Sequence, residues 1–240
     1  MSEIRLKLHP RQSAALLSEA TEILYGGAAG GGKSHLMRVV AMLLCMEVAG
    51  LQVYLFRRVS DDLRKNHLDG SSGLRAMLAS LTDSGHCKFR DDKGIFEFWN
   101  GAQIYLCHCQ HEKDMYKYQG AEIHVLLLDE LTLFTEVIFK FLRGRVRLGG
   151  LKVPDKYKGK LPMILCGSNP GNIGHAWVKK TFVDFAPPME ITRTPDEEGG
   201  MLRQYIPAKL ADNPTLTEND PGYESRLEGL GNPALVAAMK

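Results

Sequence analysis

The sequence predicts an α/β domain in which helices flank a mainly parallel β-sheet. Two observations carry this prediction: four short apolar runs are continuous instead of alternating, and a glycine-rich turn joins the first run to a helix. The runs cover residues 22–25, 53–56, 125–128 and 163–166. Strands that are covered on both faces have this pattern, which is typical of parallel sheets. Strand, glycine turn, helix and strand is the order of a doubly wound domain.

The segments between these strands predict the remaining elements. Residues 33–48 are apolar nearly all round, which predicts a well-buried helix, and apolar positions recur at helical spacing over residues 134–148 and 175–185, which predicts two more. Residues 87–109 hold three strand-like pieces separated by the turn signals DDKG and NG, which predict an antiparallel appendage to the sheet. Beyond residue 187 the chain is rich in Pro, Gly and acids, with one strand expected at 202–206 and short helices near the end. We therefore predict a core at 1–190 and a C-terminal subdomain or linker at 191–240.

Composition restricts the class of protein. The 240 residues are 44% hydrophobic and 24% charged, as in an ordinary soluble globular protein. A net charge of +2 is too small to indicate a nucleic-acid partner by itself. The five cysteines lack the spacing of a disulfide framework, so reduced thiols in a cytoplasmic protein are expected. The longest purely apolar run, residues 39–46, is much shorter than the roughly 20 residues that cross a bilayer. We expect no membrane segment.

The glycine-rich turn fits the phosphate-binding P-loop pattern G-x-x-x-x-G-K-[ST]. Glycines let successive backbone N–H groups point at a phosphate, and the following helix adds its positive N-terminal end. We expect Lys33 to reach the β- and γ-phosphates and Ser34 to ligate Mg²⁺. A chance match is the alternative, but a strand before the loop and a helix after it are the context that the motif requires. The expected nucleotide-binding residues of the loop are Gly27, Ala28, Ala29, Gly30, Gly31, Gly32, Lys33 and Ser34.

The segment HVLLLDE, residues 124–130, has the form of a Walker B strand. Asp129 would hold the Mg²⁺ through water, and Glu130 would orient and deprotonate the attacking water. The alternative is that these acids begin a helix, where negative charge is favoured. An adjacent acid pair favours a hydrolase with a glutamate base over a GTPase or a small-molecule kinase. The predicted fold is thus a P-loop NTPase of the additional-strand, catalytic-glutamate type, with ATP and Mg²⁺ as cofactors.

Three polar residues are candidates for further contacts with the nucleotide. Ser168 and Asn169 follow the strand at 163–166, so they would lie at the same sheet edge and sense the γ-phosphate. A simple Ser-Asn-Pro-Gly turn is the alternative. Gln12 precedes the first strand, and its amide could bind the adenine edge, which needs one donor and one acceptor. An exposed glutamine at a helix start is the other interpretation.

Two groups of basic residues each allow more than one interpretation. Arg57 and Arg58 follow the second strand and either reach the nucleotide or a neighbouring subunit, or pair with nearby acids such as Asp61 and Asp62. Residues 143–160 hold seven Lys or Arg against one Asp. This segment suits a DNA backbone or a neighbouring subunit, and a solvated loop is the alternative.

The ordered set of motifs resembles the ATPase domain of the large terminase subunit of tailed bacteriophages, the motor that drives DNA into procapsids. The resemblance spans residues 8–235 and lies in LHPRQ, LYGGAAGGGKSHLMR, VYLFRR, YKYQGAEIHVLLLDE, FLRGRVR and GSNPGNIGHAWVKKTF. It implies double-stranded DNA, a portal or procapsid and a small terminase subunit as partners, in the cytoplasm of a host cell. It also implies a homo-oligomeric ring when assembled, with a monomer as the alternative in isolation.

Two departures from that family matter. Family members continue into an RNase H-like nuclease domain, which we do not find in this sequence, so residues 191–240 would lead towards it and no nuclease activity is expected. Many terminases also carry an arginine inside the P-loop, whereas residues 28–31 here are Ala and Gly. An arginine finger must then come from elsewhere, and we expect Arg143 or Arg145, with Arg147 as a further candidate. Other interpretations are a helicase-like or recombinase-like P-loop ATPase, or an assembly module that binds ATP as a switch.

Overall fold

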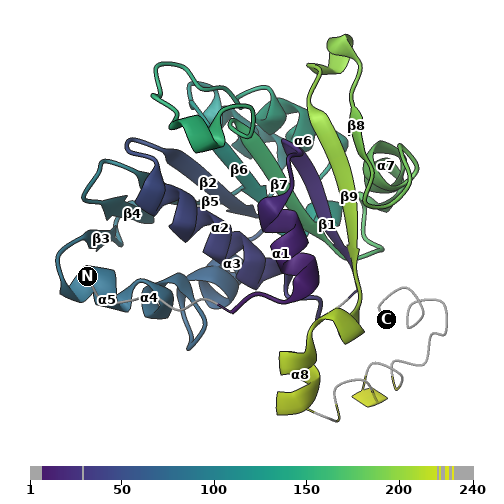
Figure 1. The fold of residues 1–240 in the computed structure, drawn as a ribbon, viewed down its shortest axis with the longest axis horizontal. Coiled ribbons are helices and arrows are strands. Elements are labelled where there is room, and N and C mark those ends of the chain that lie inside the picture. The colour runs from purple at the N-terminus through teal and green to yellow at the C-terminus, as the bar shows by residue number, and fades with distance from the viewer. Residues whose placement is uncertain (1–6, 29, 221, 223–224, 227–228, 230–240) are drawn as a thin grey trace.

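The computed structural model contains one nine-stranded sheet with helices on both faces (Figure 1). It describes residues 7–28, 30–220, 222, 225–226 and 229. The strand order is β3-β4-β5-β2-β6-β7-β1-β9-β8. The six neighbouring strands β5-β2-β6-β7-β1-β9 pair in parallel. Strands β3, β4 and β8 add antiparallel pairs at the two sides of the sheet. Because β7 lies between β1 and β6, the sheet has the extra strand that the additional-strand type requires.

The elements have the following bounds. The strands are β1 (Glu22–Gly27), β2 (Gln52–Arg57), β3 (Cys87–Arg90), β4 (Ile95–Phe98), β5 (Gln103–His108), β6 (Val125–Leu128), β7 (Met163–Ser168), β8 (Ile191–Arg193) and β9 (Leu202–Ala208). The α-helices are α1 (Pro10–Leu17), α2 (Lys33–Glu47), α3 (Ser60–Leu63), α4 (Leu74–Met77), α5 (Ala79–Asp83), α6 (Glu136–Arg143), α7 (His175–Val178) and α8 (Pro214–Asn219). Short 3-10 helices cover Glu112–Tyr118, Leu131–Leu133, Asp155–Tyr157, Asp196–Glu198 and Leu210–Asp212, and π-helical turns cover Arg64–Leu68 and Lys179–Val183.

The sheet separates two hydrophobic clusters, one on each face. Alternate residues of the same strand belong to different clusters: Leu127 packs with α1 and α2, whereas Leu126 and Leu128 pack with α6 and α7. Figure 1 shows α1 and α2 on the face towards the viewer. This arrangement explains why the strand sequences are apolar without alternation, since both faces of each central strand are buried.

Most predicted elements are present, and some boundaries differ. The four predicted strands and the helix after the glycine turn are confirmed, as are the turns at DDKG and NG. The predicted helix 134–148 is wrong beyond Arg143: Gly144 follows it, and Val146 instead forms a bridge with Ile123. The strand expected at 202–206 is β9, which pairs with β1, so the sheet continues past the boundary predicted at residue 190. Within the described residues, no helix has both the length and the apolar character needed to cross a membrane.

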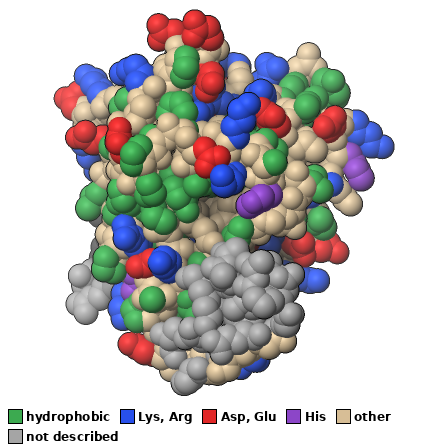
Figure 2. All heavy atoms as spheres, turned by 90° about the vertical axis from the view of Figure 1, so that its right-hand side faces the viewer, with side chains coloured by type: hydrophobic (Ala, Val, Ile, Leu, Met, Phe, Trp, Pro, Cys, Tyr) green, Lys and Arg blue, Asp and Glu red, His purple; other side chains and the backbone are tan. Residues whose placement is uncertain are grey.

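The surface beside β8 and β9 mixes charged and apolar side chains. Figure 2 shows this side of the molecule, where apolar side chains are interspersed with Lys, Arg, Asp and Glu of both signs. Exposed apolar residues in this part of the chain include Ile191 of β8 and Met189 just before it. Charges of both signs on one face suit a solvated surface more than a single-sign field for DNA.

Candidate nucleotide site

The glycine-rich loop joins β1 to α2 at the carboxyl edge of the parallel strands. Gly26 has φ +140°, and a Cβ there would lie 2.3 Å from the carbonyl oxygen of Ser168 in the neighbouring strand β7. Gly32 has φ +74°, and a Cβ there would meet the Gln12 amide at 2.4 Å. Glycine is therefore required at these positions both by the backbone conformation and by the close approach of neighbouring atoms. Helix α2 begins at Lys33, so its positive N-terminal end lies directly behind the loop.

Side chains from three different elements bind consecutive carbonyl oxygens of this loop. The oxygen of Gly30 accepts from Asn213 Nδ2 at 2.5 Å, that of Gly31 from Tyr25 Oη at 3.0 Å and that of Gly32 from Gln12 Nε2 at 2.9 Å. These contacts fix the carbonyl side of the loop. A peptide whose carbonyl is fixed also has a fixed N–H direction, because the peptide unit is planar. The loop is thereby held in shape by residues before and after it in the chain.

Gln12 lies in a different environment from the one expected. It is 2% exposed, its Oε1 accepts from the backbone N–H of His9 at 2.8 Å, and its Nε2 binds Gly32. Both ends of the amide therefore bind this chain's own backbone, so Gln12 is not an exposed helix-start residue. Ala29 lies outside the described residues. Ala28, in contrast, is buried, and its carbonyl oxygen accepts from Lys33 Nζ at 2.7 Å.

Asn169 connects the loop lysine to the candidate general base. Its Oδ1 accepts from Lys33 Nζ at 2.6 Å, and its Nδ2 lies 3.1 Å from Glu130 Oε1. Burial lowers the pKa of Lys33, and the nearby charges of Glu130 and Asp129 act in the opposite direction. The side chains of β1–α2, β6 and β7 thus converge on one point at the carboxyl edge, as the sequence predicts for a nucleotide site in this kind of fold.

Glu130 has the environment of a proton acceptor. Burial and the neighbouring charge of Asp129 raise its pKa above the ordinary glutamate value. A base is more effective when its pKa approaches the working pH. Glu130 also has φ +55°, a left-handed conformation that is uncommon for a residue with a side chain and that concentrates at functional sites. The Asn169 amide fixes the direction of the carboxylate.

Asp129 is fully buried and surrounded by donors. Its Oδ2 accepts from Arg57 Nη1 at 2.7 Å, lies 2.8 Å from His67 Nε2 and is 3.2 Å from Ser34 Oγ. Burial alone would raise the pKa of Asp129, but the hydrogen bond and charge of His67, together with Arg57 and Lys33, lower it to about 2. Oδ1 is buried and has no hydrogen-bond partner in the described part of the chain.

The residues present fit a magnesium ion. A carboxylate that stays ionised next to a serine hydroxyl supplies the oxygen ligands that Mg²⁺ prefers. The unpartnered Oδ1 of Asp129 can accept a hydrogen bond from a metal-bound water. Ser34 and Asp129 would hold the ion, which would offset the negative charge of the phosphates.

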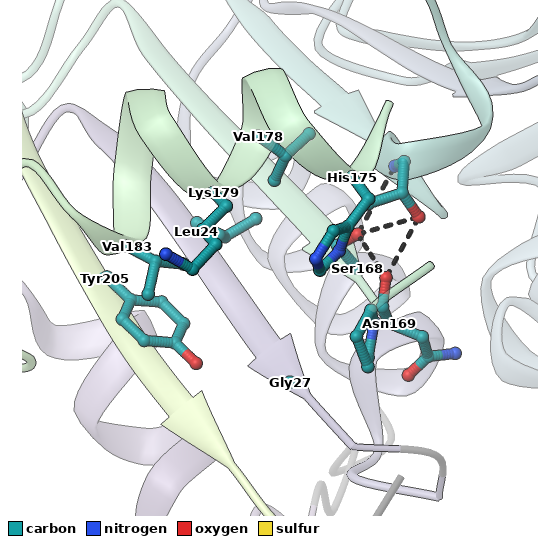
Figure 3. A pocket seen from close by; sticks show the side chains of 11 residues that line it. Leu24, Gly27, Ser168, Asn169, His175, Val178, Lys179, Val183 and Tyr205 are labelled. Carbon is teal, nitrogen blue, oxygen red and sulfur yellow. Dashed lines mark hydrogen bonds between the residues drawn. The ribbon is translucent and has the colours of Figure 1, made fainter. Parts of the chain in front are cut away.

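Ser168 lies beside this site, and its side chain forms hydrogen bonds with Thr132. Its Oγ contacts the backbone N–H and the hydroxyl of Thr132 at 3.3 and 3.2 Å. Figure 3 shows this hydrogen-bonded group at one end of a cavity of about 240 Å³ between the α7 segment, β1 and β9. Of the two predicted sensors, only Asn169 contacts Lys33 or Glu130 through its side chain.

The predicted arginine fingers lie at the amino ends of the parallel strands, opposite the end that carries the glycine-rich loop. Arg143 Nε binds Glu22 Oε1 at 2.6 Å, and Glu22 begins β1 at the end opposite the loop. The Arg145 guanidinium lies 4.6 Å from the centre of the Phe141 ring, and Arg147 pairs with Glu122. None of these three can therefore act on the phosphate site of its own subunit. Any action as a finger would have to be in trans.

Several functional candidates have no signal in the sequence motifs. His67 lies in the π-helical turn after α3, a region where the sequence predicts no element, and reaches Asp129 only through the tertiary fold. Asn213 follows the end of β9 and contacts the loop 183 positions earlier. For Arg57 the sequence leaves the nucleotide, a neighbour or acids such as Asp61 open as partners, and the structure pairs it with Asp129.

Comparisons with known proteins agree with this fold. No family model matches the sequence, and no curated protein does. Among solved structures, the large terminase from a thermophilic bacteriophage is similar with a TM-score of 0.68 and 16% identity, over 96% of this chain and 52% of that one. The same protein in complex with ATP-gamma-S has a TM-score of 0.64 at 16% identity, over 92% of this chain and 49% of that one. The ATPase domain of the Thermus phage P74-26 large terminase has a TM-score of 0.62 at 14% identity, over 98% and 93% of the two chains.

These similarities concern the fold and the extent of the chain. The chain spans about half the length of the thermophilic-phage terminase and nearly the whole of the P74-26 ATPase domain. It therefore has the fold of a phage large terminase ATPase domain, a P-loop NTPase with a mainly parallel sheet.

Proposed function

We propose that this chain is the ATP-hydrolysing motor domain of a phage large terminase. The observation that carries the proposal is the convergence of Lys33, Asn169 and Glu130 beside the buried Asp129–Ser34 pair, at the carboxyl edge of an additional-strand sheet. The similar phage structures are a large terminase and a terminase ATPase domain. The large terminase is also known in complex with ATP-gamma-S, which supports nucleotide binding here.

In the proposed mechanism the loop backbone and Lys33 bind the phosphates, and Ser34 and Asp129 hold the Mg²⁺ that comes with ATP. Glu130 receives the proton of the attacking water, since its pKa is raised and its carboxylate is fixed by Asn169. Asn169 also contacts Lys33, so the position of the lysine on the phosphate and that of the base are linked through one side chain. A magnesium ion held by Ser34 and Asp129 would offset the charge that develops on the transferred phosphoryl group.

Translocation of double-stranded DNA belongs to the proposal, together with a ring of subunits and attachment to a portal. The basic segment 143–160 lies near the edge of the sheet opposite the nucleotide site, at the top of Figure 1. Several of its cations have acidic partners on the surface: Arg147 with Glu122, Lys156 with Glu47 and Lys158 with Asp155. A sequence-independent grip on phosphates needs cations that can exchange such partners for DNA.

The test is hydrolysis and binding by the Glu130→Gln variant. The wild-type chain should hydrolyse ATP, and the variant should lose at least about 100-fold in turnover, the usual contribution of a general base. ATP binding should remain, because Glu130 holds neither the phosphates nor the metal. If wild type binds ATP and the variant changes nothing, the chain is a nucleotide switch. Stimulation of hydrolysis by double-stranded DNA and by procapsids separates a packaging motor from a helicase-like ATPase, which would be stimulated by DNA and unaffected by procapsids.

A further inference from the structure

Arg57 is an arginine that contacts the candidate hydrolysis site directly. It ends β2, whose neighbour in the sheet is β6, and the two strands run in register up to the pair Phe56 and Leu128. The next residues, Arg57 and Asp129, lie side by side at the carboxyl ends of the two strands. Arg57 Nη1 is 2.7 Å from Asp129 Oδ2, and its side chain is 14% exposed against 0% for the aspartate. The charge of Arg57 also acts on Glu130.

One oxygen of Asp129 carries two nitrogen donors. Arg57 and His67 both bind its Oδ2. A divalent cation held by Asp129 and Ser34 would repel a guanidinium at the same carboxylate, since like charges at such a distance disfavour each other. His67 is fully buried, so it has no room to leave. Arg57 is partly exposed, and its buried Nε has no partner within the described residues, so it can gain hydrogen bonds by moving.

The other candidate arginines of the same subunit are held elsewhere, and Arg58, the neighbour of Arg57, donates to the backbone carbonyl of Leu133. The P-loop residues 28–31 carry no charge. Arg143 and Arg145 lie at the opposite edge of the sheet. Arg38 is buried and donates to the carbonyl of Asn66 at 2.6 Å. In phosphoryl transfer, a guanidinium group stabilises the negative charge that develops on the equatorial oxygens in the transition state.

We propose that Arg57 is the chain's own γ-phosphate arginine, paired with Asp129 before nucleotide arrives and bound to the γ-phosphoryl oxygens once Mg²⁺–ATP occupies Asp129 and Ser34. This inference rests on the proposed ATPase function and adds a catalytic group to it. The exchange keeps each charge partnered: Asp129 passes from a guanidinium to the metal, and the guanidinium passes from a carboxylate to a phosphate. A missing arginine in the P-loop is thus replaced from the adjacent strand of the same subunit.

The test compares affinities for Mg²⁺–ATP-gamma-S and Mg²⁺–ADP, which differ only in the γ-group. In Arg57→Ala, we expect the dissociation constant for ATP-gamma-S to rise about 10- to 100-fold and that for ADP to stay within about 3-fold, because only the γ-group loses its partner. Turnover should fall by about 10³-fold, the lower range for an arginine finger. Arg64→Ala is the matched control, because Arg64 lies in the next turn and pairs with the exposed Asp91. It should leave both affinities and turnover unchanged.

Other outcomes overturn the inference. If Arg57 only neutralises Asp129, both affinities change by the same factor, and the γ-group selectivity of wild type is kept. A wild type with no preference for ATP-gamma-S over ADP contradicts it as well. Thermal unfolding of Arg57→Ala without nucleotide checks that the fold persists. If the variant does not fold, Arg57→Lys keeps the charge on a narrower head group, and the same loss of selectivity is expected in weaker form.

Mixing experiments separate action in cis from action in trans. Arg57→Ala and Glu130→Gln each inactivate one component, and a mixture regains turnover only if one subunit supplies Arg57 to another. We expect no recovery. Failure of the proposed function can be told apart from failure of this inference. If the chain binds ATP-gamma-S selectively through Arg57 but does not hydrolyse ATP, the proposed contact between Arg57 and the γ-group holds and the proposed motor function is refuted.

Discussion

Glu22 provides the sharpest test of how the sheet is held together behind the nucleotide site. It is fully buried at the start of β1 and bridges two guanidinium groups: Arg143 Nε at 2.6 Å from one carboxylate oxygen and Arg203 Nε at 2.7 Å from the other. Arg143 belongs to α6 and Arg203 to β9, so the carboxylate joins three elements. Glu22→Gln preserves shape and removes the charge.

The expected loss is about 3–5 kcal/mol of unfolding free energy, the range for removing one partner of a buried ion pair. Arg203 is 4% exposed and cannot recover its hydration, whereas the side chain of Arg143 is 18% exposed and recovers part of it, so the lower half of the range is expected. For a domain of this size, about 3 kcal/mol lowers the midpoint of thermal unfolding by roughly 6–12 °C.

Urea and thermal unfolding of Glu22→Gln, without nucleotide, measure this loss. Glu136→Gln is the control, because Glu136 forms an exposed helical pair with Lys140 that is worth roughly 0.5 kcal/mol or less. A loss below about 1 kcal/mol, close to that of the control, would refute the view that Glu22 is the buried junction of these elements.

Three further predictions concern the nucleotide site. Turnover should fall as the pH drops through the raised pKa of Glu130, because its carboxylate form is the base and Asp129, with a pKa of about 2, stays ionised there; a kcat–pH profile whose acid midpoint lies at or below about 4.3 would contradict this. Asn213→Ala should weaken ATP and ADP binding alike by about 5- to 10-fold in calorimetry, since one hydrogen bond to the loop is lost, and unequal effects would argue against a role in shaping the loop. Gly26→Ala should destabilise the protein by about 2 kcal/mol or more in urea unfolding, because the added Cβ would lie 2.3 Å from the carbonyl oxygen of Ser168. A stable variant with normal ATP binding would show that the loop has another accessible conformation.

The sequence predicts the central fold well because its signals are local. Continuous apolar runs mark the strands buried on both faces, and the glycine loop marks the turn into α2. The helices between Ser60 and Asp83 have no comparable signal, because they are short and their stability comes from tertiary packing, that of α3 on β2 and β5 and that of α5 on β3. The end of α6 at Arg143 also differs from the prediction, since the bridge between Val146 and Ile123 competes with helix continuation there.

At the site, motif positions are predictable and their partners are not. Lys33, Asp129 and Glu130 follow from residue type and spacing, and the fold brings them together. Arg143 and Arg145 are candidates only through their charge and their closeness in sequence to the acid pair. A helix carries the chain from one edge of a sheet to the other, so that closeness does not extend to space. His67 cannot be identified from the sequence, because a lone histidine carries no pattern.

The shortness of β6 has a mechanical consequence. Its four fully buried residues, Val125–Leu128, lie between the candidate base at one end and the bridge from Ile123 to Val146 at the other. At about 3.3 Å per residue, the two ends of β6 are separated by only ~13 Å of extended backbone, which resists stretching and is clamped by a strand on each side. The candidate base and the bridge between Ile123 and Val146 are therefore joined by a short, inextensible stretch of chain, so their separation is fixed.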